Sequence, residues 1–146
     1  MTAKEYLQQI RNAHKRIQTL EARREQLRSD MYSIKSPAGS MNPDKVQSSM
    51  TGDALIKIIA QVDSMERDIV RELRKLYCLQ RTITNQIDGI KDERYHTILY
   101  QRYVLFYMWE QIAVNMGIEI RWVYRLHGKA LQEFGRIYSN VLNKTN

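Results

Sequence analysis

Side chains suited to contacts with nucleic acid gather in one short segment of this chain, RWVYRLHGK. Guanidinium and ammonium groups bind phosphates, and a guanidinium can also donate two hydrogen bonds to the acceptors of guanine. Val123, Leu126 and Ala130 recur at the three- and four-residue spacing of a buried helix face. The side chains between them are therefore predicted to face outward, namely Arg121, Trp122, Tyr124, Arg125 and Lys129.

Each of these outward side chains has an expected role at DNA. A recognition helix places its first turns against base edges, so Arg121 and Arg125 are expected to read bases. Tyr124 and Lys129 are placed for the phosphate backbone, and Trp122 for a sugar or the neighbouring helix. A basic face that is simply solvated is the alternative interpretation of the same residues.

A glycine turn precedes this segment and joins it to another amphipathic stretch. Gly117 lies where the chain would leave a first helix, and a positive φ costs glycine little. Tyr107–Phe134 is thus predicted to form a helix-turn-helix, and an ordinary helical pair with a glycine cap is the alternative. The facing sides of the two helices are expected to consist of Ile112, Ala113, Met116, Ile118, Val123 and Leu126.

Residues typical of catalysis or metal binding form no recognisable motif. His14, His96 and His127 lie far apart in sequence, and none has a Cys or acidic residue at metal-ligand spacing. Glycine-rich phosphate loops and nucleophile motifs are missing from the sequence too. We therefore expect no enzyme, no metal and no cofactor, and we expect His127 to be a surface histidine. Packing in the core is expected for Tyr100, Tyr103, Phe106 and Tyr107.

The stretch from Arg94 to Phe134 resembles region 4 of sigma-70-type transcription factors, which binds the promoter −35 element and touches RNA polymerase. A wider resemblance, carried by MTAKEYLQQIR, SPAGSM and RWVYRLHGKAL, is to small sigma-like or late-gene regulators encoded by phages and prophages of Firmicutes. These resemblances imply double-stranded DNA as a partner and RNA polymerase as a possible second one. The narrower resemblance rests on Ile98, Leu99, Arg102, Tyr103, Glu110, Ile112, Ala113, Gly117, Ile118, Val123, Ala130 and Leu131.

Two residues depart from the sigma pattern where the recognition helix should begin. The family usually has Ser or Thr at the N-cap followed by Arg, whereas this chain has Glu119 and Ile120. Glu119 is a weaker cap that would repel a phosphate, and Ile120 cannot donate a hydrogen bond to a base. The −35 sequence is therefore not implied. Base contacts of the family also map to Arg121 and Arg125.

Two long apolar patterns fill the N-terminal part of the chain. Spacings of three and four predict a helix over residues 3–34, and only Arg24 interrupts its apolar seam. A stricter heptad from Leu55 to Ile90 predicts a second helix that packs against another helix. Lys35–Asp53 contains both prolines of the chain and is predicted to be a loop or a partly disordered tip.

These patterns together predict an all-α fold with two domains. Residues 1–90 should form a long antiparallel, coiled-coil-like helical hairpin with a flexible tip at 35–53. Residues 91–146 should form a three-helix, sigma region 4-like helix-turn-helix module. The sequence around Gly89 favours a break and a hinge between Asp88 and Asp92.

Several apolar residues lie outside the seam that the two long helices would share. Leu7, Ile56, Val70 and Tyr77 are examples, and two helices alone bury little surface. A homodimer through the hairpin would cover them and would present two recognition helices to two half-sites. A monomer whose hairpin packs on the C-terminal module or on polymerase is the alternative.

Composition limits the location and partners of the chain. Its 146 residues carry 23 Lys and Arg against 16 Asp and Glu, a net charge of +7 that suits phosphate without sequence selectivity. The apolar runs fall short of the roughly 20 residues that span a bilayer, and the start lacks a signal peptide. We therefore expect a soluble, cytoplasmic protein. Cys78 is the only cysteine and is expected to be a small packed residue.

The function expected from these features is sequence-specific binding of double-stranded DNA by a transcriptional regulator. It would act beside RNA polymerase on phage or prophage genes. A complete sigma factor is not expected, because promoter melting needs an aromatic-rich region that residues 1–90 lack. The alternatives are a phage DNA-packaging subunit of the small terminase type and a helical protein–protein adaptor.

Overall fold

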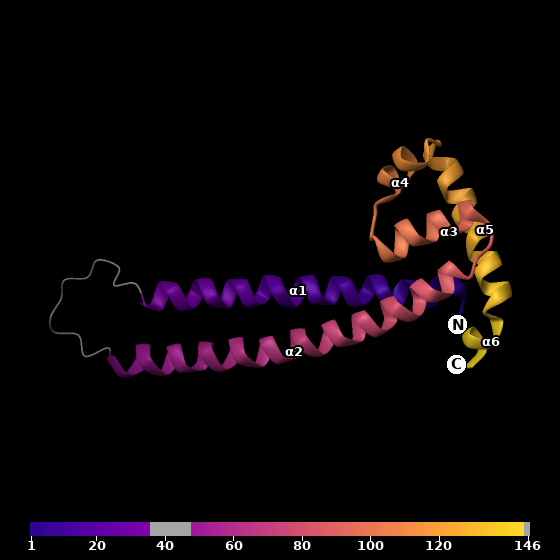
Figure 1. Cartoon of the computed structure of the whole chain (residues 1–146). Coiled ribbons are helices and arrows are strands. Elements are labelled where there is room, and N and C mark those ends of the chain that lie inside the picture. The colour runs from indigo at the N-terminus through magenta and orange to yellow at the C-terminus, as the bar shows by residue number, and fades with distance from the viewer. Residues whose placement is uncertain (36–47, 145–146) are drawn as a thin grey trace. The chain divides into compact units, whose positions relative to one another are not determined.

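The computed structural model describes residues 1–35 and 48–144, and the regular elements in these ranges are all helical (Figure 1). The predicted all-α class is therefore confirmed. None of the described helices combines the length and apolar character of a membrane span. The elements are α1 (Ala3–Lys35), α2 (Ser48–Asp88), α3 (Glu93–Leu99), the π-helical segment η1 (Tyr100–Val104), α4 (Trp109–Met116), α5 (Ile120–Ile137) and α6 (Ser139–Lys144).

Both ends of α1 and the end of α2 lie close to where the sequence predicts them, whereas the start of α2 does not. α1 matches the predicted helix, and the break between Asp88 and Asp92 is confirmed. Residues 36–47 of the predicted loop lie outside the described residues. The rest of that prediction was wrong, because α2 already begins at Ser48. Gly52 inside a helix costs about 1 kcal/mol, which the many hydrogen bonds of so long a helix offset.

The chain divides into two compact units. One, here called the terminal unit, joins Met1–His14 to the chain from Lys75 onward, and the other, the middle unit, lies within Lys15–Arg74. The terminal unit thus contains the first turns of α1, the end of α2 and all the later helices. These units reflect contacts alone, so the domains proposed at 1–90 and 91–146 stay a prediction.

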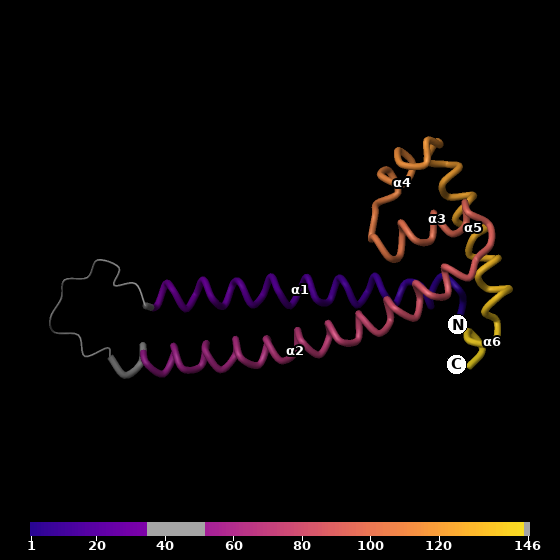
Figure 2. The backbone as a smooth tube through the Cα atoms, viewed as in Figure 1, coloured from indigo at the N-terminus to yellow at the C-terminus, as the bar shows by residue number. Residues whose placement is uncertain are grey.

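In the middle unit, α1 and α2 run side by side in opposite directions (Figure 2). Arg16 pairs with Glu72 at 3.4 Å, while Arg24 and Arg28 both pair with Glu66, at 3.1 and 2.8 Å. The arginine that interrupts the apolar seam of α1 is therefore matched by a carboxylate on α2.

Apolar residues of α2 differ widely in exposure. Ile69 is buried in the middle unit, whereas Ile56, Ile59 and Val70 are 67%, 41% and 46% exposed. In the terminal unit the thiol of Cys78 is exposed. The expectation that it is packed was wrong, because position 78 lies on the side of α2 opposite the buried Leu76, Ile83 and Ile87.

The terminal unit has a core that joins both ends of the chain. Tyr6 of α1 lies 6.1 Å from Phe134 of α5 between ring centroids, and its hydroxyl donates to Gln86 of α2 at 3.1 Å. Leu7, one of the residues expected to need another surface, is fully buried here. The buried apolar residues of this unit include Ile10, Ile83, Ile87, Ile98, Leu99, Tyr103, Ile112, Val123 and Leu142.

A capping box starts α1. The Glu5 carboxylate accepts hydrogen bonds from the Thr2 N–H at 2.7 Å and the Thr2 hydroxyl at 2.9 Å, and the Glu5 N–H donates to the Thr2 hydroxyl at 3.2 Å. Reciprocal bonds of this kind satisfy N–H groups that a helix start leaves without intrahelical partners. The first turn of α1 is therefore well defined where it meets α5.

The junction of α2 and α3 depends on a close approach at Gly89. The Tyr138 hydroxyl donates to the Gln86 carbonyl at 2.6 Å, and a Cβ at Gly89 would lie 2.5 Å from that hydroxyl oxygen. After the break, the Asp92 carboxylate accepts from the N–H groups of Arg94 and Tyr95 and so caps α3. A side chain at position 89 would therefore have to displace the Tyr138 hydroxyl, so the constraint there comes from contact rather than from φ.

Replacement of Gly89 by alanine should lower the free energy of unfolding by about 1 to 3 kcal/mol, because the new methyl group overlaps the Tyr138 hydroxyl. Urea denaturation measures the change. In a Tyr138→Phe background the same replacement should cost clearly less. Equal costs in the two backgrounds would show that Tyr138 is not the constraint.

Candidate nucleic-acid interface

A left-handed glycine separates α4 from α5. Gly117 has φ 65° and ψ 33°, its N–H donates to the Val114 carbonyl, and the Ile118 N–H donates to the Ala113 carbonyl. These two bonds form a Schellman motif, which ends a helix sharply and favours glycine at the left-handed position. The sequence-based assignment of Gly117 to a positive φ is confirmed. The chain then needs only Ile118 and Glu119 before α5 begins.

The inner face of α5 is fully packed. Val123, Ala130 and Phe134 are completely buried, and Leu126 is half-buried beside them. On α4, Ile112 is buried while Ala113 and Met116 are half-buried. The inward positions predicted from spacing are therefore inward.

His127 belongs to this inner face, so the prediction of a surface histidine was wrong. Its side chain is 7% exposed, and its Nε2 lies 2.9 Å from the Tyr103 hydroxyl in a buried hydrogen bond. Burial lowers the pKa of His127 to about 4, and burial raises the pKa of Tyr103 to about 12. Both groups are neutral at pH 7. His127 therefore holds α5 to η1 and offers no charge to a phosphate.

Trp109, the first residue of α4, packs against three side chains of α5 and η1. Its ring lies edge-on to His127 at 4.7 Å and to Tyr124 at 5.3 Å between centroids, and the Arg102 guanidinium lies 4.0 Å above it. Tyr124 is 49% exposed, so one side of its ring packs and the other faces outward. Among the predicted site residues, Tyr124 therefore also has a structural role, because its ring packs against Trp109.

Two arginines lie close together next to this tryptophan. Arg11 Nη1 donates to the Arg102 carbonyl at 2.8 Å, and Arg102 Nη1 donates to the Tyr107 carbonyl at 2.9 Å. Burial, and then repulsion by Arg11, lower the pKa of Arg102. Both guanidinium groups donate hydrogen bonds to backbone carbonyls. These bonds fix the segment before α4.

That segment has an unusual backbone at Phe106, whose φ is 60°. A bulky side chain rarely adopts this conformation, which needs support from its surroundings. The Phe106 ring stacks on His14 of α1, with centroids 4.1 Å apart and planes 9° from parallel. Among the aromatic residues expected in the core, Tyr103 is buried, whereas Tyr100, Phe106 and Tyr107 are half-buried.

The outer face of α5 carries all five predicted site residues. Trp122 is 50% exposed, and Arg121, Tyr124, Arg125 and Lys129 are exposed as well. The Arg125 guanidinium lies 4.9 Å over the Trp122 ring, a distance typical of a cation–π contact. The structure thus brings Trp122 and Arg125 together and leaves their outward edges accessible.

Two further contributors to this face were not predicted from the sequence. Gly128 lies between Arg125 and Lys129, is exposed, and has no atom within 4 Å of a Cβ built on it. Glycine inside a helix costs about 1 kcal/mol relative to alanine, and that cost in an amphipathic helix was the available signal. The other contributor is α3, since Arg94 and Tyr95 line a shallow depression together with Trp122, Arg125, Lys129 and Gln132.

The start of α5 is negatively charged at the cap. Glu119 makes no capping hydrogen bond with its side chain and instead accepts from Arg121 Nε at 3.0 Å. Both side chains are highly exposed, so this ion pair is worth little and can open when a stronger partner for Arg121 arrives. Ile120 is 38% exposed next to it.

In residues 1–35 and 48–144, no group of three or more His, Cys, Asp or Glu side chains is arranged to hold a metal ion. No protein-family model, curated protein or solved structure matches the chain. The chemistry of the candidate interface is therefore that of exposed cations and aromatic rings on a helix with a packed inner face.

The stability of the terminal unit should depend on pH through His127. Its pKa is about 4 when folded and about 6.5 when unfolded, so the unfolded chain binds more protons between these values. The contribution is fully present above about pH 6.5 and is lost as pH falls toward 4, by up to about 1.4 kcal/mol per pH unit. Urea midpoints measured from pH 7 to 5.5 should therefore fall for the natural chain.

A His127→Gln variant should be less stable at pH 7 yet should lose most of that pH dependence, because glutamine does not titrate. The chosen pH range lies above the ordinary titration of carboxyl groups. Parallel curves for the two proteins would contradict the assignment of His127 as a buried neutral group.

Proposed function

We propose that this protein is a regulator of transcription that binds double-stranded DNA through the outer face of α5. In this proposal α3 to α5 form a sigma region 4-like helix-turn-helix module, and α1 with α2 forms a coiled-coil-like hairpin. The chain would act beside RNA polymerase on phage or prophage genes and would catalyse no reaction.

The observation that carries the proposal is the contrast between the two faces of α5. Its inner face is closed by Val123, His127 and Ala130, while its outer face carries exposed Arg121 and Arg125. The exposed Trp122 ring beside these arginines leaves apolar surface in water, and that exposure has no packing role inside the protein. A helix in the major groove, in contrast, uses arginines for base edges and aromatic rings for sugars.

The geometry supports distinct roles for the individual side chains. Arg121 and Arg125 lie one turn apart in the first half of α5, the part of a recognition helix that meets bases. Lys129 and Arg94 flank this line and suit phosphates, so the contact area would extend from α5 to α3. Gly128 leaves a bare strip of helix at which a nucleic acid could approach the backbone closely.

Exposed apolar side chains in and just before α4 are available for a contact with RNA polymerase. Leu105, Met108 and Val114, in and just before α4, are 43%, 66% and 80% exposed. Exposed apolar side chains of this size can meet the apolar surface of a protein partner. They support a protein partner in addition to DNA.

Genome-wide footprinting in the host would separate this proposal from its two alternatives. Peaks upstream of late genes would support a transcriptional regulator, and peaks confined to a packaging site would support a DNA-packaging subunit. Absence of peaks would favour a protein–protein adaptor and would contradict DNA binding.

Replacement of Arg125 by alanine should weaken binding to a specific site by about 1 to 3 kcal/mol and relax base preference, because a bidentate contact to guanine is lost. Lys129→Ala should weaken binding to all duplexes similarly and reduce the salt dependence. Fluorescence anisotropy with specific and random duplexes measures both effects. Equal losses on the two duplexes for Arg125→Ala would refute a base-reading role.

Gly128→Leu is a steric probe of the same face. A side chain there meets nothing inside the protein, and leucine favours a helix over glycine, so thermal stability should stay equal or rise. DNA affinity should fall at least several-fold on every sequence if this strip of helix faces the duplex. Unchanged affinity in a fully folded variant would place the DNA elsewhere.

A further inference from the structure

A second surface of the chain lies on α2, within the middle unit. Its side chains recur at spacings of three and four on the side of the helix away from α1, so they form one stripe. We call it the outer stripe of α2. It consists of Ile56, Ile59, Ala60, Asp63, Arg67, Val70 and Arg74, all of them exposed.

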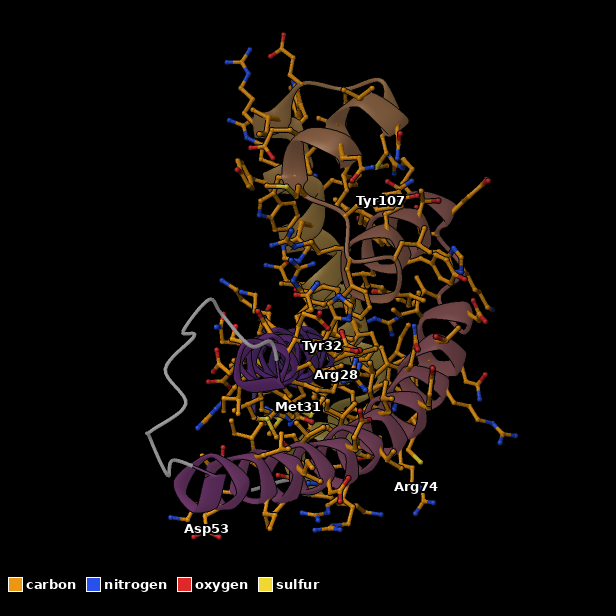
Figure 3. All side chains as sticks on the ribbon, turned by 90° about the vertical axis from the view of Figure 1, so that its left-hand side faces the viewer. Arg28, Met31, Tyr32, Asp53, Arg74 and Tyr107 are labelled. Atoms are coloured by element: carbon orange, nitrogen blue, oxygen red, sulfur yellow. The ribbon has the colours of Figure 1, made fainter. Side chains whose placement is uncertain are left out.

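The outer stripe combines apolar surface with charges of both signs. Ile56, Ile59 and Val70 are 67%, 41% and 46% exposed, which is costly for β-branched aliphatic side chains in water. Arg67 and Arg74 line a shallow hollow around Val70, and Figure 3 shows Arg74 pointing away from the ribbon of α2. A partner must therefore offer both apolar groups and charges complementary to Asp63 and the two arginines.

The stripe itself meets that requirement when it is turned around. In an antiparallel pair of two such stripes related by a two-fold axis level with Met65, Asp63 lies opposite Arg67 of the partner subunit, and this pair occurs twice. The same register sets Ala60 opposite Val70 of the partner subunit. It also sets Ile56 against the aliphatic stem of the partner's Arg74. An axis level with Asp63 would instead place two carboxylates together.

We propose that the outer stripe of α2 binds the outer stripe of a second copy of this chain, antiparallel, with Asp63 of each protomer against Arg67 of its partner. Two charge pairs fix the register, and the aliphatic groups next to them supply apolar burial. Nucleic acid would leave Asp63 and the isoleucines without matching groups. The inference does not rest on DNA binding by α5.

The test is the mass of the full chain in solution without DNA, measured by sedimentation equilibrium at micromolar concentration. The natural chain of 17.4 kDa should sediment with twice that mass. Asp63→Arg and Arg67→Asp should each weaken dimerisation about tenfold or more, because every charge pair becomes repulsive. Circular dichroism should show unchanged helix content, since both residues are exposed.

Mixing the two single variants should restore the dimer, because each copy then supplies the charges that the other lacks. The double variant that carries both changes should dimerise like the natural chain. Lys57→Asp, the same kind of charge change at an exposed position outside the stripe, should leave the mass unaltered.

A monomeric natural chain would overturn the proposal, and so would single variants that remain dimers. Failure of the mixture to form dimers would exclude the antiparallel register. If Arg67→Asp weakens DNA binding without changing the mass, the stripe contacts nucleic acid instead, and the proposed pairing is wrong. The mass measurements are independent of whether α5 reads DNA.

Discussion

A buried hydrogen bond between His127 and Tyr103 determines which side of α5 faces outward. The bond joins the middle of α5 to η1, and Trp109 closes over the same imidazole from the start of α4. Three elements thus meet at one neutral side chain. Because a helix that buries position 127 must expose positions 121, 125 and 129, the basic face is a consequence of this contact.

The positive charges of the terminal unit fall into two groups with different tasks. Arg11 and Arg102 are partly buried and donate to backbone carbonyls, so they stabilise the strained segment at Phe106. Arg125 and Lys129 are exposed and remain accessible to a partner. Net charge alone does not distinguish these groups, although only the exposed one can respond to the salt concentration.

The sequence predicts what depends on local spacing and fails where distant residues meet. Apolar spacings of three and four predicted the first long helix, a heptad predicted the second, and Gly117 with its apolar neighbours predicted the α4–α5 turn. His127 was assigned to the surface although it lies four residues after Val123 and three before Ala130, a spacing that places it inside. The contact of Tyr6 with Phe134 has no local signal, since only the fold brings those residues together. The early start of α2 was missed because the prolines of Lys35–Asp53 suggested a loop over that whole segment.

The first turns of α1 support the helix that carries the basic face. The Ala3 Cβ lies 3.8 Å from the Cβ position of Gly135, and the Tyr6 ring packs near Phe134. The α5 helix therefore packs against the first turns of α1. A fragment cut from the chain at residue 91 would leave these aromatic and apolar groups in contact with water. The segment that carries the basic face is therefore not a portable module, and transferring it to another protein requires the first turns of α1 as well.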